Sequence, residues 1–333
     1  MISMSIISKI KTKLERLQKE IKIIYPEGWN ADIVECAKNL VSKTKYIQPI
    51  LLFRTKQEIP SQLPSSIKKI VVDEISDVDM KKYAETIYEI RKNKGLSMDE
   101  ALTLAKSPNF LASVMVALNE ADAEICGIEY STADTLRAAL QIVGPNPNTP
   151  RVCSGFIMEK GSKRYVFGDS SLNIDPDAEQ LAAIAKTLGY LAKNIALIKK
   201  PYIAMLSYST NGSGKGPSVD KVRHAYEIAS VDEIFTSKFK IFGEIQFDAA
   251  FDLEVMHKKI KNLDWNQPAN VFVFPDINAG NISYKIVERL GKYKAIGPII
   301  LGLKKPVNDL SRGAKALDVE NLSYITALQA ITK

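Results

Sequence analysis

Short apolar runs, many of them rich in β-branched residues, alternate with longer amphipathic segments along most of the chain. The runs include IKIIY, PILLF, KKIVV, AEICGI, YIAML, NVFVF and IGPIIL. Loop residues follow them, and in most cases a stretch of helical length comes next, such as DIVECAKNLVSK. Apolar strands separated by helices are typical of parallel sheets that are covered on both faces. The pattern therefore predicts an α/β protein with mainly parallel sheets.

The length of 333 residues suggests two domains of roughly 150 residues each. The clearest boundary is VGPNPNTPR, residues 143–151, where prolines and asparagines interrupt regular structure. A second crossing is expected in GKYKAIGP, residues 291–298. The first domain would then combine 1–146 with 298–333, and the second would be 147–297. Two such domains would enclose a cleft, and ligands often bind in clefts between domains.

Composition excludes several classes of protein. Hydrophobic residues make up 46% of the chain and charged residues 25%, which is ordinary for a globular protein. The 45 lysines and arginines are dispersed and the net charge is only +7, which argues against a dedicated nucleic-acid surface and suits small polyanionic substrates. No apolar run approaches the roughly 18 residues that would span a membrane.

The N-terminal segment lacks the apolar core of a secretory signal and is interpreted as an amphipathic helix. Its apolar stripe would consist of Ile7, Ile10, Leu14, Leu17 and Ile21. The three cysteines are far apart and odd in number, which excludes a CxxC site and favours a reducing cytoplasm. With only two histidines, a histidine-rich metal site is excluded as well.

The segment YSTNGSGKGPS invites comparison with phosphate-binding loops. The Walker spacing requires glycine where Ser209 stands, and it requires serine or threonine where Gly216 follows Lys215. The dinucleotide motif also fails, because Pro217 takes the place of its third glycine. Two interpretations remain, namely a mobile loop between domains and a flexible loop near a ligand.

Two aspartates, Asp248 and Asp252, are four residues apart and would share a helix face. Paired carboxylates can bind Mg²⁺. A solvated helix face or a helix cap explains the same spacing, and no further ligand stands beside the pair in the sequence.

Two arginines are candidates for anion binding. Arg91 ends a helical segment that is followed by Gly95, and the helix dipole alone explains a basic last turn. Arg137 lies in an apolar helix that begins with a capping box from Ser131 to Asp134. We expect its guanidinium to be buried, and a buried guanidinium needs an anionic partner such as Asp134.

The segment KPVNDLSRGAKALDVE, residues 305–320, has two interpretations. In the first, Asp309 pairs with Arg312 and Asp318 caps the helix that follows. In the second, Arg312 recognises an anion and Asp318 transfers protons, so that the segment forms half of an active site.

Several strings together resemble the phosphate acetyltransferase family, in order from about Arg91 to the C-terminus. They are IYEIRKNKG, STADTLRAALQIV, AMLSYSTNGSGKG, GEIQFDAA, VFVFPDINAGNISYKIVERL and GPIILGLKKPVNDLSRG. The resemblance implies transfer of an acetyl group between coenzyme A (CoA) and phosphate, with CoA as a substrate and no metal or cofactor. It also implies a homodimer whose subunits have two three-layer α/β/α domains, similar to isocitrate and isopropylmalate dehydrogenases, with the active site in the cleft between them.

The same resemblance assigns roles to individual residues. Asp318 corresponds to the catalytic carboxylate, and the SRG string places the catalytic serine and arginine at Ser311 and Arg312. The arginines linked to CoA and phosphate recognition correspond to Arg91 and Arg137. A weaker phosphate contact is expected from Ser131, because it stands at a helix N-terminus. Family members often carry cysteine directly after SRG, whereas this chain has Ala314, which favours direct transfer in a ternary complex.

The reaction requires a base that can deprotonate the CoA thiol. A thiol with a pKa of about 8.5 is mostly protonated at neutral pH, and an ordinary aspartate, at about 3.9, is a weak base for it. We therefore expect Asp318 to be buried and not paired with Arg312. The guanidinium is then free to hold acetyl phosphate and to stabilise the developing oxyanion, and Ser311 can donate a further hydrogen bond.

Three alternatives remain open. The first is a phosphate butyryltransferase or a broader acyl range, because the acyl pocket cannot be identified from the sequence. The second is a non-catalytic domain that senses acetyl-CoA. The third is a metal-dependent dehydrogenase of the same fold, for which Asp248 and Asp252 would be the candidate ligands.

Overall fold

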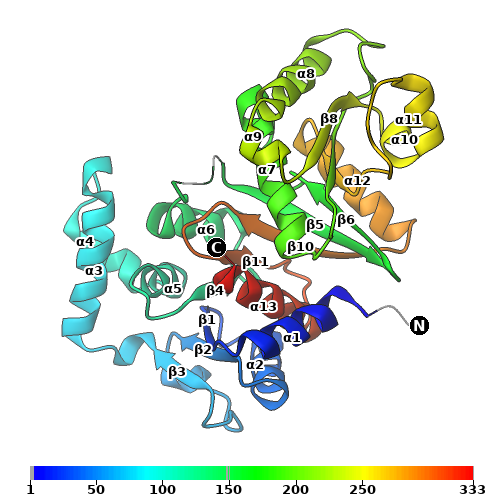
Figure 1. Cartoon of the computed structure of the whole chain (residues 1–333). Helices are drawn as coiled ribbons and strands as arrows, with labels where there is room; N and C mark the ends of the chain where they lie inside the picture. Colours follow the sequence, from blue (N-terminus) through cyan, green and yellow to red (C-terminus); the bar gives the residue numbers. More distant parts are fainter. Residues whose placement is uncertain (1–3, 148, 150, 333) are drawn as a thin grey trace. The chain divides into compact units, whose positions relative to one another are not determined.

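A computed structural model of the chain describes residues 4–147, 149 and 151–332. The chain forms two compact units (Figure 1). One unit contains residues 7–146 and 303–333, and the other contains residues 147–302 together with the segment that ends at Ile6. The chain thus leaves the first unit and returns to it, and each unit has a sheet of its own.

The first unit is built on a five-stranded sheet in the order β11-β4-β1-β2-β3, in which every neighbouring pair is parallel. Its strands are β1 (Ile21–Tyr25), β2 (Ile47–Phe53), β3 (Lys68–Val71), β4 (Ala123–Cys126) and β11 (Val307–Asp309). Because all the strands run the same way, their carboxyl ends meet at one edge. The segments that leave this edge begin at Pro26, Arg54, Gly127 and Leu310, among others.

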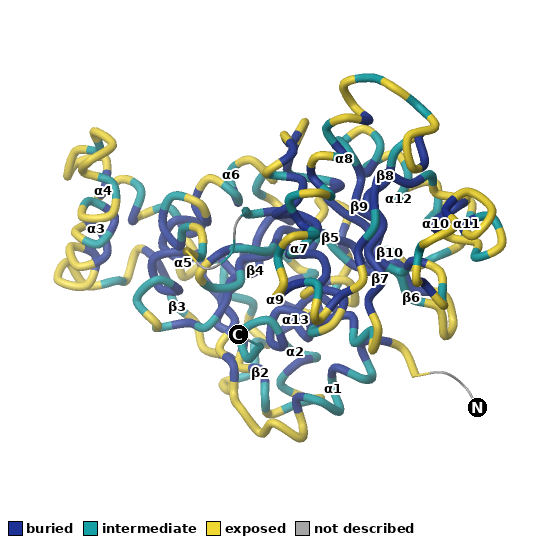
Figure 2. Tube along the Cα trace, turned by 45° about the horizontal axis from the view of Figure 1, so that its top comes forward, coloured by how far each residue is buried: buried dark blue, intermediate teal, exposed yellow. Residues whose placement is uncertain are grey.

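Helices cover this sheet and bury it. All four residues of β4 are buried, and since successive side chains of a strand point to opposite faces, both faces are covered (Figure 2). The longer helices of this unit are α1 (Ile6–Leu17), α2 (Ala31–Lys43), α3 (Asp77–Arg91), α4 (Met98–Ala105), α5 (Pro108–Ala117), α6 (Thr132–Ala138) and α13 (Ala316–Ile331). Among them, α13 packs against α2 and four strands, and α5 packs against β1, β2 and β4.

The second unit has a six-stranded sheet in the order β10-β5-β6-β9-β7-β8. Strands β6, β9, β7 and β8 are parallel to one another, whereas β5 is antiparallel to both β10 and β6. The strands are β5 (Cys153–Lys160), β6 (Lys163–Gly168), β7 (Tyr202–Leu206), β8 (Lys240–Ile245), β9 (Val271–Val273) and β10 (Lys294–Leu301). The helices are α7 (Ala178–Asn194), α8 (Pro217–Ser230), α9 (Glu233–Thr236), α10 (Phe247–Phe251), α11 (Leu253–Lys259) and α12 (Ile277–Arg289).

The predicted architecture of two α/β units with mainly parallel sheets is confirmed, and the second return of the chain lies further along than the sequence suggested. The predicted ranges change at 297/298, whereas the two units change at 302/303. The reason is that β10 continues to Leu301 across Pro298. The register between β10 and β5 shifts between Ile296 and Ile299, and this irregularity accommodates a proline within a strand.

The N-terminal helix agrees with the predicted stripe in part. Ile7, Ile10 and Leu14 are buried on α1, but Leu17 is 46% exposed. Ile21 belongs to β1, because the chain turns at Gln18, which has a φ of 50°. Among the described residues, no helix combines the length and apolarity needed to cross a membrane.

Candidate active site

Two neighbouring strands bring distant parts of the sequence to one edge of the five-stranded sheet. β4 and β11 are parallel, and Cys126 is paired with Asp309 at their carboxyl ends. The amide of Leu310 continues the pairing by donating to the Cys126 carbonyl at 2.7 Å. The segment after β4 leads to Ser131 and α6, and the segment after β11 leads directly to Ser311 and Arg312. The sheet therefore brings both predicted motifs to the same edge.

The first turn of α6 is organised around Asp134. Ser131 is the N-cap, as predicted: its hydroxyl accepts the Asp134 amide at 3.1 Å and donates to Asp134 Oδ2 at 2.7 Å. Arg137 Nη2 donates to Asp134 Oδ1 at 2.7 Å. The Ser131 hydrogen bond, and then the charges of Arg137 and Arg312, lower the pKa of the Asp134 carboxyl. This aspartate therefore lies near three of the predicted site residues.

Arg137 has the predicted partner, but it is not buried as expected. Its side chain is 57% exposed. Its sequence neighbours Leu136 and Ala138 are apolar, but the helix is short and buries mainly Thr135 and Ala138. Arg137 lies on the exposed side of the helix, where its guanidinium is accessible to a ligand.

Ser311 and Arg312 lie in an exposed turn. The Ser311 carbonyl accepts the Ala314 amide at 2.9 Å, which fixes the turn. Within the described part of the chain, Arg312 makes no hydrogen bond or ion pair. The proposed ion pair between Asp309 and Arg312 is therefore wrong. Asp309 is the buried last residue of β11, and its carboxylate accepts the Thr132 hydroxyl at 2.7 Å instead.

Asp318 differs from expectation in two respects. It is not the N-cap of α13, because the helix begins at Ala316 and Asp318 occupies the third helical position, where its Oδ2 accepts the Lys315 amide at 3.1 Å. It is also exposed, whereas we expected a buried carboxylate. The first turn of a helix has free amides that stabilise a carboxylate at the surface, which explains the exposure, and the burial that was expected to make Asp318 more basic is absent. No ion pair with Arg312 is found among the described residues, as the chemistry requires.

Arg91 is the one predicted site residue that the described contacts do not join to this edge. It is the half-buried last residue of α3. In the described residues its side chain has no hydrogen bond or ion pair. Helix α3 packs against α5 and against residues 139–143, the π-helical turn that continues α6. Its role therefore rests on the resemblance alone.

The sequence reasoning missed a buried carboxylate beneath this edge. Glu27 follows β1 closely and is fully buried. Its oxygens accept backbone amides from residues 127–130, with N···O distances of 2.7 Å from Glu129 and 2.8 Å from Tyr130. Burial raises the pKa of Glu27, and the amides act in the opposite direction. An acidic residue just after an apolar strand, as in Tyr25–Pro26–Glu27, was the signal in the sequence.

The two aspartates proposed as metal ligands have other partners. Asp252 is the N-cap of α11 and accepts the amides of Glu254 and Val255. Asp248 pairs with Lys259 at 2.8 Å. In the part of the chain that the structure describes, no group of three or more histidine, cysteine, aspartate or glutamate residues is arranged to hold a metal ion.

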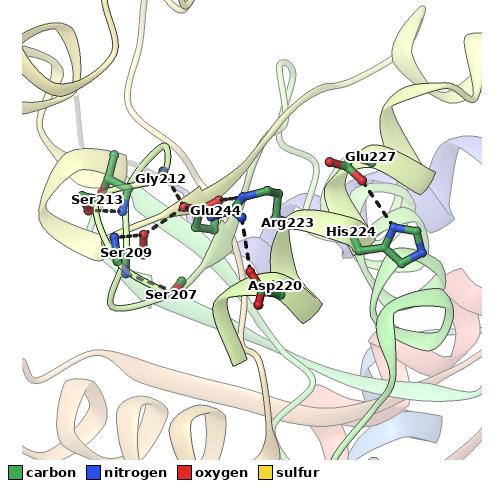
Figure 3. A network of polar contacts seen from close by, with 11 residues as sticks. Ser207, Ser209, Gly212, Ser213, Asp220, Arg223, His224, Glu227 and Glu244 are labelled. Atoms are coloured by element: carbon green, nitrogen blue, oxygen red, sulfur yellow. Dashed lines mark hydrogen bonds and ion pairs between the residues drawn. The ribbon is translucent and has the colours of Figure 1, made fainter. Parts of the chain in front are cut away.

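The first part of the glycine-rich segment is anchored by hydrogen bonds to a buried carboxylate, while its mobility and its nearness to a ligand stay predictions. Figure 3 shows its contacts with the buried Glu244. Glu244 Oε1 accepts the Ser209 hydroxyl at 2.9 Å and the Gly212 amide at 2.7 Å. Arg223 of α8 donates from Nε to Glu244 Oε2 at 3.1 Å. The turns at Asn211 and Gly212, with φ of 49° and 84°, thus have a fixed support in β8.

Comparison with known proteins places this geometry in context. Residues 5–327 match the family described as phosphate acetyl/butaryl transferase. The chain belongs to this family. It is 44% identical to the phosphate acetyltransferase of Mycoplasma pneumoniae over 98% of this chain and 100% of that one. It is 38% identical to that of Bacillus subtilis over 94% of this chain and 96% of the relative.

A solved structure extends the likeness to three dimensions. The phosphotransacetylase from Streptococcus pyogenes is 40% identical, and the two chains superpose with a TM-score of 0.90 over 98% of this chain and 99% of that one. The family resemblance inferred from the sequence strings is therefore confirmed.

The three cysteines of this phosphate acetyl/butaryl transferase family member are unsuited to nucleophilic catalysis. Cys36, Cys126 and Cys153 are free and buried. Burial raises the pKa of each thiol, to about 12 for Cys36. A thiolate is the nucleophilic form, so these residues are poor acceptors for an acyl group. At the position after SRG stands the buried Ala314.

Proposed function

We propose that the chain is a phosphate acetyltransferase, which converts acetyl-CoA and phosphate into acetyl phosphate and CoA. The observation that carries this conclusion is near full-length similarity to phosphate acetyltransferases, in a chain whose sheet edge gathers Ser131, Arg137, Ser311 and Arg312. Two accessible guanidinium groups near one edge suit a reaction in which the phosphate is present on both sides of the equation.

The mechanism that these groups support is direct acyl transfer. Asp318 accepts the proton of the CoA thiol, and the sulfur attacks the carbonyl carbon of acetyl phosphate. The new C–S bond forms as the C–O bond to phosphate breaks, and phosphate leaves with the electron pair. Arg312, which has no ion pair among the described residues, is available to hold the phosphate and the developing oxyanion, with a hydrogen bond from Ser311.

Arg137, Arg91 and Ser131 are assigned to substrate binding. Arg137 is exposed and has one ion pair, with Asp134, so a substrate phosphate can compete for its guanidinium. Ser131 is the N-cap of α6 and can turn its hydroxyl to an anion at the helix N-terminus. Direct transfer is also supported by the three buried cysteines, because an acyl-cysteine intermediate would need an accessible thiolate.

We further propose that the chain acts as a homodimer in the cytoplasm. The dimer is what the family resemblance implies, and the compartment agrees with three free cysteines. Light scattering of the purified chain measures its mass in solution, and a monomeric mass of 36.9 kDa would contradict the dimer.

The test of the proposed function is an assay with acetyl phosphate and CoA, without added metal ion or NAD. Formation of the thioester is followed by its ultraviolet absorbance, and phosphate release is measured in parallel. We expect equal amounts of acetyl-CoA and phosphate. Butyryl phosphate is the comparison substrate, and a preference for it would favour the butyryl alternative. If neither compound gave a thioester, the assignment would be wrong.

A further inference from the structure

Asp309 stands at the junction of the two segments that carry the candidate site. It ends β11, and the next residue, Leu310, is tied to β4 through the Cys126 carbonyl. The next two residues, Ser311 and Arg312, lie at the surface. The position of this turn therefore depends on the last residues of β11.

The side chain of Asp309 reaches across to α6. Its Oδ2 accepts the hydroxyl of Thr132, the first residue of α6, at 2.7 Å. Thr132 directly follows Ser131, and Arg137 lies further along the same helix. One hydrogen bond thus connects the start of the helix with the strand that leads to Arg312.

The other side of Asp309 is tightly enclosed. Its Oδ1 is buried and has no hydrogen-bond partner among the described residues. Gly127, with a φ of 105°, lies against it so closely that a Cβ at this position would collide with Oδ1. The segment 127–130 is in turn held by the Glu27 carboxylate. The carboxyl group of Asp309 therefore has little freedom to move.

Stability alone does not explain an acidic group at this position. Asp309 is 3% exposed, and in the described part of the chain no cation forms an ion pair with it. Burying a carboxylate without a counter-charge costs free energy. Proteins commonly retain such a destabilising group where its position is needed for function.

We propose that Asp309 is a positioning residue, whose hydrogen bond to Thr132 fixes the start of α6 relative to the turn at residues 311–312. This inference rests on the proposed function, because it assigns both segments to one reaction. Asp309 itself does not contact the reacting atoms. It acts by holding the substrate-binding residues of α6 at a constant distance from the catalytic turn.

The test is a double-mutant cycle with Thr132→Val and Asp309→Ala, which removes both carboxylate oxygens, measured as kcat and KM with acetyl phosphate and CoA. Thr132→Val removes the hydroxyl at nearly constant volume, and we expect kcat/KM to fall about 10-fold. Thr132→Ser retains the hydroxyl and should restore activity to within about two-fold of the wild type. The double variant should be no worse than the more affected single variant, because both changes break the same contact.

Two controls distinguish a loss of positioning from a nonspecific effect of mutation and from a loss of folding. Asp264→Asn, at a side chain that is 98% exposed, should leave the kinetics unchanged. Thermal unfolding of each variant separates loss of positioning from loss of folding, and we expect Thr132→Val to unfold within a few degrees of the wild type. Full activity in Thr132→Val, or effects that multiply in the double variant, would overturn the inference. An inactive wild type would overturn the proposed function first and this inference with it.

Discussion

Glu124 illustrates how strongly a single buried carboxyl can respond to pH. It lies in the middle of β4 and is fully buried, with one hydrogen bond from the Ser113 hydroxyl at 2.7 Å. Its Oε1 has no partner among the described residues. Burial raises the pKa of this carboxyl to about 8, with a further contribution from Glu27. The group is therefore mainly neutral at pH 7 in the folded chain.

This shift makes the stability of the protein depend on pH. Because the folded state binds the proton more tightly than the unfolded state, stability falls as pH rises from about 4.5 to about 8 and is constant above that range. A difference of about 3.5 pH units corresponds to about 5 kcal/mol. We expect Glu124→Gln to remove this slope and to be more stable than the wild type above pH 8.

Denaturation midpoints measured from about pH 5 to about pH 9 check this prediction. Glu35→Gln is the matched control, because Glu35 is an exposed residue of α2. The control should follow the wild-type curve. Parallel curves for wild type and Glu124→Gln would mean that the pKa of this carboxyl is not raised in the folded chain.

Asp318 is the residue on which the proposed chemistry depends. Replacing it with asparagine keeps the shape of the side chain and removes the base, so kcat should fall at least about 100-fold, with KM for CoA roughly unchanged. Asp99→Asn is the control, since Asp99 is also an exposed aspartate in the first turn of a helix, α4. Near-normal turnover in Asp318→Asn would reject the general-base role.

At the scale of elements, the longer apolar strands that precede helices could be predicted from the sequence. Short strands with polar residues could not. The apolar runs that form β1, β2 and β7 could be recognised in the sequence by their length and apolar character. In the structure these strands are largely buried. β11 has only three residues, Val307, Asn308 and Asp309, and two of them are polar. Such residues are typical of loops, and only pairing with β4 makes them a strand.

The family resemblance named Ser311, Arg312 and Asp318 as candidate site residues without any knowledge of the fold, and their roles stay predictions. Their surroundings could not be predicted from the sequence. The sequence strings could not reveal that Asp309 bonds to Thr132, because that contact joins residues 177 positions apart. Exposure was equally hidden: Arg137 was expected to be buried because its neighbours in the sequence are apolar, but neighbours in a helix face different sides.

The loop after β7 allows a prediction at the level of an element. Glu244 supports residues 209–212 through hydrogen bonds from Ser209 and Gly212 and is paired with Arg223. Although burial acts against it, the bonds from Arg223 and Gly212 hold the pKa of Glu244 below its ordinary value. Glu244→Ala would leave these donors without an acceptor, so we expect a loss of about 2 kcal/mol in stability.

Hydrogen exchange of the loop amides and denaturation midpoints together measure this effect. Exchange should accelerate at Gly212, whose amide donates to Glu244. The control is Glu227→Ala on the neighbouring helix α8, where the glutamate side chain is 61% exposed and its carboxylate lies beside the exposed His224 (Figure 3). Unchanged protection in Glu244→Ala would mean that the loop is held by other contacts.

At the scale of the whole molecule, the predicted site residues all belong to the unit with the five-stranded sheet, although they extend from Arg91 to Asp318. The chain leaves this unit for residues 147–302 and then returns with the turn that carries Ser311 and Arg312. The net charge of +7 has no concentrated basic block. Recognition of a polyanionic substrate should therefore depend on a few local cations rather than on the overall field.

If a few local cations bind CoA, Arg91→Ala and Arg137→Ala should weaken its binding. Each change should raise KM for CoA about 10-fold and leave kcat within a few-fold, because each removes a cation that holds an anionic group. The arginines also make KM sensitive to salt, since screening weakens an exposed charge pair over a Debye length of about 8 Å at physiological ionic strength. The rise of KM with added salt should therefore be shallower in both variants than in the wild type.

The control is Arg289→Ala, which removes an arginine that is 85% exposed in the last turn of α12, a position comparable to that of Arg91 in α3. If CoA were attracted by net charge alone, all three variants would show the same small change, since each lowers the charge by one unit. If local cations bind it, Arg289→Ala keeps the wild-type KM and the wild-type salt dependence. An unchanged KM in Arg91→Ala would remove that residue from the site, where resemblance alone has placed it.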